Sequence, residues 1–299
     1  MSQMMMLPFS AGALLLLLPL LGDLALGEIS NDFHQCLQFF YEGTPPTGIA
    51  ASQYQPICQR YENQYRFATM YDRGRRAPVY SAYILKKSND SKERNEWKFE
   101  PQLVSENKSA EMEDFPQTPD DDLKESQAVL DDYRSSSSNP EYTKGHLTPV
   151  CHQETLHDRE ATYTLTNIVP QRAASNNGPW SALEKKMLNK IKPHCTGEMY
   201  VITGAIPYQN ERLLKERVSI PEYMWSAYCC PEYTSTPYLT YAAVGRNDPD
   251  SGNDIVERGR NSKGYDVKEM TVQDLENILE RRLNMQIMLF RNKCIPTGE

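Results

Sequence analysis

Lys-Gly-His-Leu-Thr-Pro, at residues 144–149, is the stretch of this 299-residue chain from which its organisation is best worked out. A glycine directly before His146 and a proline three residues after it indicate the end of a strand, where water can reach the imidazole. Two more polar stretches follow, Thr-Leu-Thr-Asn-Ile-Val-Pro-Gln at 164–171 and Asn-Asn-Gly-Pro-Trp-Ser-Ala-Leu-Glu at 176–184. His146 is therefore the starting point of a candidate site.

The last of these stretches predicts a helix from about Asn176 to Lys190. Asn176 and Glu184 would share one face of it, because positions i, i+4 and i+8 drift by only about 40° per step. Pro179 is compatible with a first helical turn, and if it is the first helical residue, Asn176 lies just before the helix. Four apolar residues are expected to anchor the helix on the core: Trp180, Leu183, Leu188 and Ile191.

These residue types together supply the chemistry of phosphodiester hydrolysis. The amide oxygen of Asn176, the carboxylate of Glu184 and bound waters suit a hard cation such as Mg²⁺. A neutral His146 can take a proton from water near physiological pH, and the cation can stabilise the leaving oxygen. Arg94, in Lys-Glu-Arg-Asn-Glu-Trp-Lys at residues 92–98, could stabilise the charge that develops on the phosphate.

On these motifs the chain resembles the DNA/RNA non-specific endonucleases of the ββα-metal class, over roughly residues 65–290. It is especially similar to their secreted vertebrate branch. The resemblance implies that His146 is the general base and that Asn176 is the sole direct protein ligand of the metal. It also implies that Glu184 holds metal-bound waters and that Arg94 stabilises the transition state. Two further residues match supporting polar positions of the family, Asn167 and Gln171.

Two positions depart from the Asp-Arg-Gly-His motif of that family. Thr143 and Lys144 stand where the family has Asp and Arg. Lys144 keeps the positive charge and would act on the phosphate near Arg94, but it lacks the planar guanidinium fork, and Thr143 cannot serve as a carboxylate. The retained His146, Asn176 and Glu184 favour an enzyme. Thr143 and Lys144 favour a catalytically silent extracellular binding module that keeps the nuclease fold.

Each site residue also has a plain structural interpretation when it is taken alone. A histidine in a strand is more often a core residue, and an asparagine before a helix is typically an N-cap. Glu184, followed by two lysines, is typical of a solvated helix face, and Arg94 lies near two glutamates, as in a surface ion pair. Cys151, His152 and His157 are an alternative zinc set, which their spacing and the lack of a fourth ligand disfavour.

The net charge of −8, from 32 Lys and Arg against 40 Asp and Glu, is concentrated in one segment. Residues 100–132 carry eleven acids and two bases, and a serine tract at 135–138 follows. We therefore expect residues 100–140 to be a long solvated loop inserted into the domain. Residues 28–299 carry −7, which leaves +2 outside residues 100–132, so the acidity does not exclude a polyanionic substrate.

An apolar run at residues 11–21, followed by small residues up to Gly27, predicts a secretory signal peptide over residues 1–27. An uncleaved membrane anchor is the alternative. No other stretch of the sequence is apolar enough to span a membrane. The mature protein is therefore expected to be secreted or luminal, without stable membrane association after signal cleavage.

The seven cysteines agree with an oxidising compartment. We expect Cys36 and Cys58 to close a short N-terminal loop and Cys151 to stay unpaired. The other four would form two more bridges: Cys195, Cys229, Cys230 and Cys294. Asn89 and Asn107 begin acceptor sequons for N-glycans on surface loops.

Strand-like stretches outnumber helices and do not alternate with them, which favours an α+β fold with a mostly antiparallel central sheet. We expect this fold to contain the ββα-metal motif and to be stapled by disulfides. Residues 28–66 would form a Cys-containing N-terminal leader, and residues 67–299 the nuclease domain with its acidic insertion. Strands are expected at 67–71, 79–85, 162–169, 199–206, 218–228 and 239–244, and a second helix at 271–283.

The leading hypothesis is a secreted, Mg²⁺-dependent endonuclease, with Mn²⁺ as an alternative ion, that cleaves DNA and RNA with little sequence preference. A phosphodiesterase acting on small substrates is a third alternative. The sequence shows no self-complementary apolar stripe, so it does not predict an oligomeric state.

Overall fold

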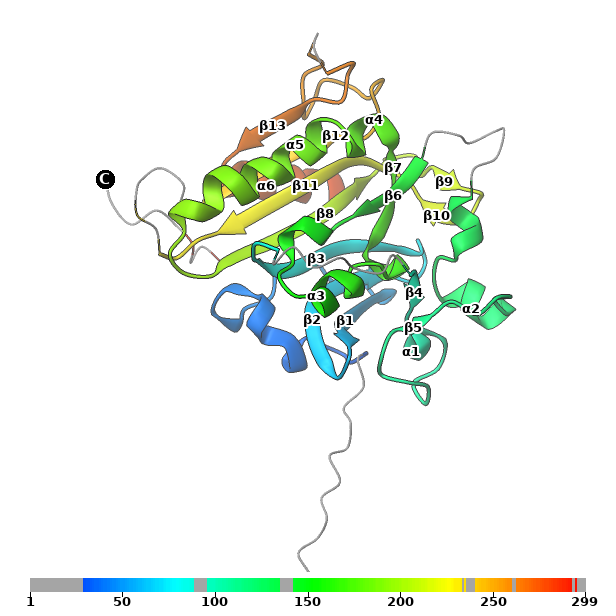
Figure 1. Ribbon diagram of the computed structural model, residues 1–299. Coiled ribbons are helices and arrows are strands. Elements are labelled where there is room, and N and C mark those ends of the chain that lie inside the picture. Colours follow the sequence, from blue (N-terminus) through cyan, green and yellow to red (C-terminus); the bar gives the residue numbers. More distant parts are fainter. Residues whose placement is uncertain are drawn as a thin grey trace, which may run out of the picture.

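The computed structural model of the chain describes residues 29–88, 96–134, 142–232, 234, 240–259, 262–291 and 294. Its centre is a seven-stranded antiparallel sheet in the order β1-β2-β3-β8-β11-β12-β13 (Figure 1). The expected α+β fold with a mostly antiparallel sheet is confirmed. The strands are β1 Tyr54–Tyr61, β2 Gln64–Asp72, β3 Ala77–Leu85, β8 Met199–Pro207, β11 Pro221–Cys229, β12 Thr240–Arg246 and β13 Val267–Met270.

Four predictions fall wholly or partly outside the described residues: the signal peptide at 1–27, Arg94, the sequon at Asn89, and the end of the acidic insertion at 135–140. Asn107, the acceptor of the second sequon, is described and is exposed. Among the residues that the structure describes, no helix is long and apolar enough to cross a membrane.

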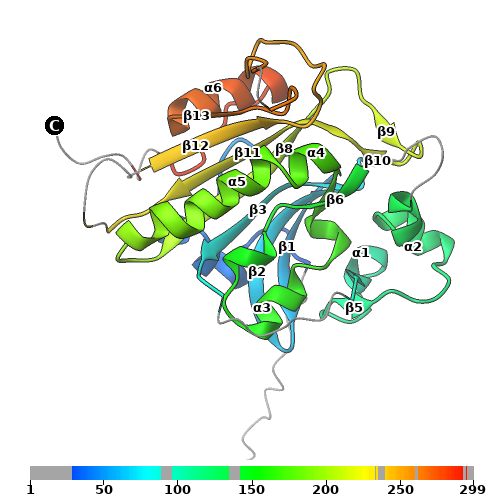
Figure 2. The same cartoon turned by 45° about the horizontal axis from the view of Figure 1, so that its top comes forward.

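Both faces of the sheet are covered, which explains why its central strands are almost continuously buried. In β8, Val201 belongs to the apolar cluster on one face and Ile202 to the cluster on the other, as the two-residue period of a strand requires. Helix α6 (Val272–Leu283) covers one face through residues such as Leu279. Helix α5 (Pro179–Lys186) covers the opposite face (Figure 2).

The ββα unit expected from the sequence is present on the face that α5 covers. Strands β6 (Tyr142–His146) and β7 (Ile168–Arg172) pair antiparallel and lead into α4 (Ala173–Asn176) and α5 (Figure 1). The other elements are short: 3₁₀ turns η1 His34–Phe39, η2 Tyr41–Gly43, η3 Leu130–Tyr133, η4 Val150–His152, η5 Leu165–Asn167 and η7 Lys192–His194; the π-helical turn η6 Met187–Ile191; helices α1 Pro101–Val104, α2 Asp121–Ser126 and α3 Leu156–Ala161; and strands β4 Lys98–Phe99, β5 Glu113–Asp114, β9 Leu213–Leu214 and β10 Val218–Ser219.

Two expected elements differ in the structure. The strand expected at 162–169 begins only at Ile168, because residues 165–167 form η5. The strand expected at 218–228 is divided into β10 and β11, with Ile220 between them. In both places the residues stay buried through the interruption, so the pattern of burial does not reveal the change in backbone.

Asn247, directly after β12, fixes β7 against the central sheet. Its Oδ1 accepts a hydrogen bond from the backbone N–H of Arg172 at 2.8 Å, and its Nδ2 donates to the carbonyl of Pro170 at 3.1 Å. The same amide nitrogen donates to the carbonyl of Pro221, on β11, at 2.8 Å. One buried side chain therefore sets the position of the strand that precedes α4.

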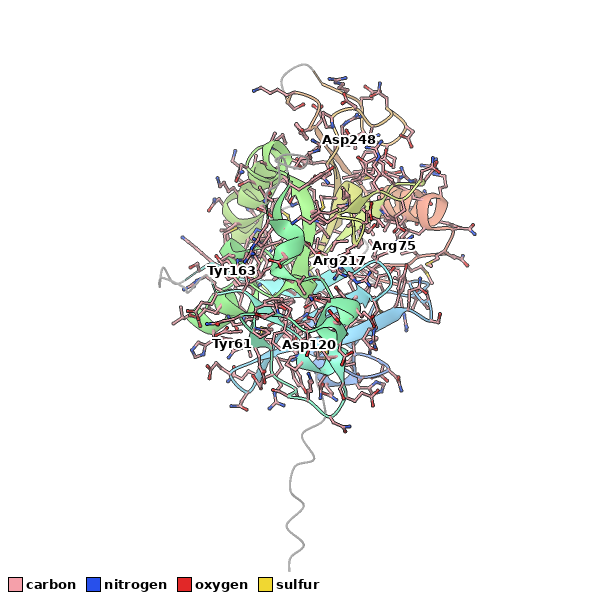
Figure 3. The ribbon with its side chains drawn as sticks, turned by 90° about the vertical axis from the view of Figure 1, so that its right-hand side faces the viewer. Tyr61, Arg75, Asp120, Tyr163, Arg217 and Asp248 are labelled. Carbon is pink, nitrogen blue, oxygen red and sulfur yellow. A yellow bond between two sulfur atoms is a disulfide. The ribbon has the colours of Figure 1, made fainter. Side chains whose placement is uncertain are left out.

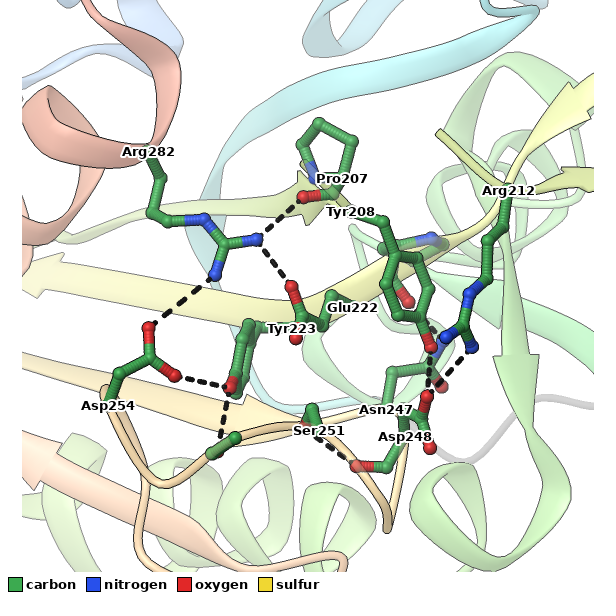
Figure 4. Close-up of polar contacts among 12 residues, drawn as sticks. Pro207, Tyr208, Arg212, Glu222, Tyr223, Asn247, Asp248, Ser251, Asp254 and Arg282 are labelled. Atoms are coloured by element: carbon green, nitrogen blue, oxygen red, sulfur yellow. Dashed lines mark hydrogen bonds and ion pairs between the residues drawn. The ribbon is translucent and has the colours of Figure 1, made fainter. Parts of the chain in front are cut away.

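The polar contacts in Figure 4 join α6 to the same edge of the sheet. Arg282 donates to the carbonyl of Pro207 at 3.0 Å and forms an ion pair with Glu222 on β11. A second nitrogen of the guanidinium lies 3.9 Å from Asp254. Because Arg282 and Glu222 are both largely buried, this pair is shielded from salt and holds the C-terminal turn of α6 on the sheet.

The acidic segment corrects the expectation of a long solvated loop. Its described part, residues 100–134, contains α1, α2, η3 and β5, which pairs with β4 just before the segment. Leu103, Leu123 and Val129 in it are buried. Arg217 of the body, labelled in Figure 3, forms an ion pair of 2.8 Å with Asp132 and donates to the carbonyl of Lys124 in the last turn of α2. Charge counting missed these apolar residues because they are spaced between the acids, and most of the acids do face solvent.

The stretch 28–66, expected as an N-terminal leader, contributes β1 to the central sheet. Cys36 and Cys58 are bonded, as expected, and the remaining bridges are Cys195–Cys230 and Cys229–Cys294. Cys151 is free, which confirms the expected odd thiol.

The Cys229–Cys294 bridge closes a 65-residue loop and joins β11 to the segment after α6. Replacing both cysteines by serine is expected to lower the free energy of unfolding by about 4 kcal/mol, the loop-closure entropy of a crosslink of that span. Urea denaturation of the double variant and the wild type measures the difference. Cys151→Ser is the matched control and should stay within about 1 kcal/mol of the wild type; equal losses in both would contradict the crosslink explanation.

Candidate active site

Strands β6 and β7 hold the two stretches of sequence that carry the polar motif. Their register pairs His146 with Ile168 and Thr143 with Gln171. A Cβ atom on Gly145 would lie 2.3 Å from Oε1 of Gln171 and 2.6 Å from its Cβ. No side chain fits there, so the glycine before His146 is required by the close approach of Gln171.

His146 ends β6 in an aromatic environment. Its ring centroid lies 5.7 Å from that of Trp97 and 5.2 Å from that of Tyr163 (Figure 3 labels Tyr163). Its Nε2 has no hydrogen-bond partner among the described residues. Burial, together with the positive charge of Lys144, lowers the pKa of His146 to about 4. The imidazole is therefore neutral at physiological pH and can accept a proton.

Lys144 lies over aromatic rings rather than beside a carboxylate. Its Nζ is 4.9 Å from the ring centroid of Trp97 and 5.8 Å from that of Tyr133. No ion pair between Lys144 and an acid is found in the described part of the chain. Burial lowers the pKa of the ammonium group. A cation held in this way can still attract an anion such as a phosphate.

Thr143, which stands where the related family has a carboxylate, orients the side chain of Asn176. Nδ2 of Asn176 donates to Oγ1 of Thr143 at 3.0 Å, and Thr143 in turn donates to the carbonyl of Gln171 at 2.9 Å. Oδ1 of Asn176 accepts no hydrogen bond from any side chain or backbone group that the structure describes. The amide nitrogen is therefore occupied, and the oxygen is available to a ligand.

Asn167 and Gln171 have supporting roles. The buried amide of Asn167 makes four hydrogen bonds: Oδ1 accepts from Ser81 and Thr148, and Nδ2 donates to the carbonyls of Thr148 and Thr162, all at 2.9–3.1 Å. It has no capacity left for a ligand. Gln171 donates to Oγ of Ser175 at 3.2 Å, and so joins β7 to α4.

The continuous helix expected from Asn176 to Lys190 is wrong. Helix α4 ends at Asn176, α5 begins at Pro179, and residues 187–191 form the π-helical turn η6. Gly178 allows the break, because a Cβ atom there would lie 2.3 Å from the carbonyl oxygen of Ala174. Pro179 is the first residue of α5, and Asn176 therefore lies before that helix. This confirms the position that the sequence predicts for Asn176 when Pro179 begins the helix.

The expected anchor of α5 is confirmed. Trp180, Leu183 and Ile191 are buried, and Leu188 packs against the same apolar cluster. A Cβ on Gly245 of β12 would lie 2.8 Å from the indole ring of Trp180, so the ring rests directly on the sheet backbone.

Glu184 lies on α5, partly buried and close to Cys151 and Tyr83. Burial raises the pKa of its carboxyl to about 8, against the opposing effect of Lys185. A carboxylate that is costly to ionise gains from a cation placed beside it. The carboxylate of Glu184 and the amide oxygen of Asn176 are both oxygen donors, the chemistry that suits Mg²⁺.

The alternative zinc set is not supported. Both ring nitrogens of His152 make hydrogen bonds of 2.9 Å, to the hydroxyl of Tyr83 and to the carbonyl of Glu184. His157 packs edge-on against Tyr61. The described residues contain no group of three or more His, Cys, Asp and Glu side chains placed to hold a metal ion.

Sequence analysis missed the aromatic surroundings of His146. Trp97 lies within the quoted stretch 92–98, and Tyr163 directly precedes 164–171, so both are neighbours of motif residues in the sequence. Trp97 is 49 positions and Tyr163 is 17 positions from His146 in the sequence. Their approach to His146 therefore depends on the tertiary fold, and no local pattern shows it. Adjacency to the motifs is the one signal that could have pointed to them.

A seven-stranded antiparallel sheet that carries a ββα unit is the scaffold on which these residues lie. Residues 46–285 match the family model described as DNA/RNA non-specific endonuclease, and the chain belongs to that family. The chain is 33% identical over 293 residues to the human endonuclease domain-containing 1 protein and 35% identical over 224 residues to the mouse protein of that name. These alignments cover 96% and 73% of this chain, and 53% and 43% of the relatives, so the chain spans about half their length.

A cyanobacterial nuclease from Nostoc is 23% identical over 167 residues, covering 50% of this chain and 59% of that protein. Among solved structures, a chain of the EndoG/EndoGI complex matches with a TM-score of 0.46 and 17% identity, covering 84% of this chain and 89% of that chain.

The raised pKa of Glu184 predicts how the metal-free protein responds to pH. The folded state binds a proton at Glu184 more tightly than the unfolded state, so its contribution to stability is present below the ordinary pKa of 4.5 and is lost as pH rises toward about 8. Unfolding free energies measured in EDTA should fall over this window relative to Glu184→Gln, and Mg²⁺ should reduce the fall. Parallel pH profiles for the two proteins would contradict the assignment.

The contact between Thr143 and Asn176 predicts a selective effect of the hydroxyl. Thr143→Val should weaken Mn²⁺ binding by about tenfold, as expected when a residue that orients a ligand is lost, because the amide can then rotate. Thr143→Ser keeps the hydroxyl and should bind like the wild type. Electron paramagnetic resonance of free Mn²⁺ gives both affinities, and equal affinities for Val and Ser would show that Thr143 does not orient the ligand.

Proposed function

We propose that this protein is a metal-dependent endonuclease that hydrolyses phosphodiester bonds of DNA and RNA with little sequence preference. Membership of the family supports the class of reaction. The observation that carries the finer proposal is the neutral imidazole of His146, whose Nε2 has no partner among the described residues. Mg²⁺ is the proposed ion, with Mn²⁺ as the alternative, because the donors are oxygen atoms.

In the proposed reaction, His146 takes a proton from the attacking water through Nε2. Asn176 would hold the metal through Oδ1, and Glu184 would orient the waters of that metal. When bound, the ion stabilises negative charge on the leaving oxygen. Lys144, supported by the face of Trp97, is proposed to stabilise the phosphate, and Arg94 is proposed to share that role.

A catalytically silent binding module is the second candidate, and one observation favours it. Thr143 places a neutral hydroxyl beside Asn176, where the related family has a carboxylate. The site then carries one negative charge fewer to attract a cation. The hydrogen bond from Asn176 to Thr143 still orients the amide. The missing negative charge is therefore the feature that favours the silent module over the endonuclease.

We also propose that the protein is secreted or luminal and acts on nucleic acid there. Three disulfides support this compartment, because such bonds persist where the environment is oxidising. The exposed Asn107, in a sequon, is a proposed N-glycan acceptor.

A plasmid-nicking assay on the disulfide-intact protein tests the proposed function. Nicking should require Mg²⁺ or Mn²⁺, stop with EDTA, and fall by at least about 100-fold in His146→Ala, the usual loss of a general base. His157→Ala is the matched control, because His157 is exposed and packs on Tyr61 away from β6, and it should cleave like the wild type.

The pH profile tests the state of the base in the same assay. Because His146 must be neutral to accept a proton, cleavage should fall only as pH drops through about 4, rather than near the ordinary 6.5. An acid limb at 6.5 would contradict the buried environment of the base. Folded protein that cleaves neither DNA nor RNA with either metal would establish the silent module instead.

A further inference from the structure

His152 connects three parts of the molecule without itself facing the reacting groups. It ends η4, is fully buried, and lies six residues after His146. Nδ1 is 2.9 Å from the hydroxyl of Tyr83 on β3, and Nε2 is 2.9 Å from the backbone carbonyl of Glu184 on α5. One imidazole thus bridges the central sheet and the helix that carries the proposed acid.

These contacts define the tautomer. A carbonyl oxygen only accepts, so Nε2 must carry the proton that is donated to Glu184. The neutral ring then has an acceptor at Nδ1, and the hydroxyl of Tyr83 must donate to it. The two hydrogen bonds therefore run in one direction, from Tyr83 to His152 to Glu184.

The carbonyl of Glu184 lies where the helix changes its geometry. It also accepts from the backbone N–H of Met187, the first residue of the π-helical turn η6, and that N–H is shared with the carbonyl of Leu183. Single π-turns concentrate at functional sites. The donor from His152 supports the carbonyl at this irregular point.

The other end of η4 is tied to the proposed base. Thr148 lies between His146 and His152, and the amide of Asn167 holds both its N–H and its carbonyl. The N–H of Leu147 donates to the carbonyl of Asn167 at 3.0 Å. The chain from His146 to His152 is therefore fixed, and a displacement of Glu184 relative to His152 is a displacement relative to His146.

We propose that His152 is a positioning residue of the nuclease site, which sets the place of Glu184 relative to His146 through the backbone carbonyl of Glu184. The inference rests on the proposed nuclease function. It assigns His152 no contact with substrate or metal.

Three substitutions at His152 separate positioning from simple packing. The amide nitrogen of Gln reaches about as far as Nε2, so His152→Gln keeps the donor to Glu184. The amide of Asn reaches only to the position of Nδ1, so His152→Asn loses that donor but stays polar. His152→Leu fills the space without any hydrogen bond. Tyr83→Phe keeps the imidazole and removes only the group that fixes its tautomer.

The variants are compared by Mn²⁺ affinity, by kcat and KM on DNA, and by thermal unfolding. His152→Asn and His152→Leu should weaken Mn²⁺ binding and lower kcat by about 10-fold or more, with KM for DNA unchanged, as for other residues that support a metal site indirectly. His152→Gln should stay within about threefold of the wild type in both. The Mn²⁺ affinity and kcat of Tyr83→Phe should lie between those of His152→Gln and His152→Leu. This variant tests the proposal even if a His152 variant does not fold.

Nitrogen-15 NMR of the histidine side chains gives a readout that needs no turnover, and the wild type should show His152 as the neutral tautomer protonated at Nε2. The opposite tautomer, or folded Asn and Leu variants with unchanged Mn²⁺ affinity and kcat, would overturn the positioning role while leaving the nuclease intact. A wild type that neither binds Mn²⁺ nor cleaves, with the tautomer as expected, would overturn the proposed function and with it the role assigned to His152.

Discussion

The side-chain amide of Asn167 is the interaction on which the arrangement of the site depends. Its four hydrogen bonds join Ser81 on β3, both backbone groups of Thr148 after β6, and the carbonyl of Thr162. An amide with all its hydrogen bonds made inside the core is costly to disturb, because any replacement leaves several backbone groups unsatisfied. The strand that ends at His146 is therefore fixed to the sheet at the point where the chain turns toward η4.

The titratable side chains of the candidate site share one electrostatic property. Burial lowers the pKa of His146 and Lys144 and raises that of Glu184, so in each case it favours the uncharged form. A divalent cation beside Glu184 and a phosphate beside Lys144 would each offset the cost of keeping the charge.

The sequence allowed the class of fold, most long strands, α6, the anchor of α5 and the unpaired thiol to be predicted, because each leaves a local signal of apolar periodicity or residue type. It did not allow the break between α4 and α5 to be placed with certainty, since that break depends on the close approach of Gly178 to a carbonyl. It misjudged the acidic segment, whose buried Leu103 and Val129 are hidden among charges. Arg94 stays a prediction, because it lies outside the described residues.

The sequence by itself determined which chemical groups are available: a histidine after glycine, an asparagine before a helix and a glutamate eight residues later. The tertiary structure alone decided their states. Trp97 and Tyr163 enclose His146, Thr143 turns the amide of Asn176, and His152 holds the carbonyl of Glu184. The physical reason is that residue identity fixes what a group can donate or accept, whereas burial and partners from distant parts of the chain fix its charge and orientation.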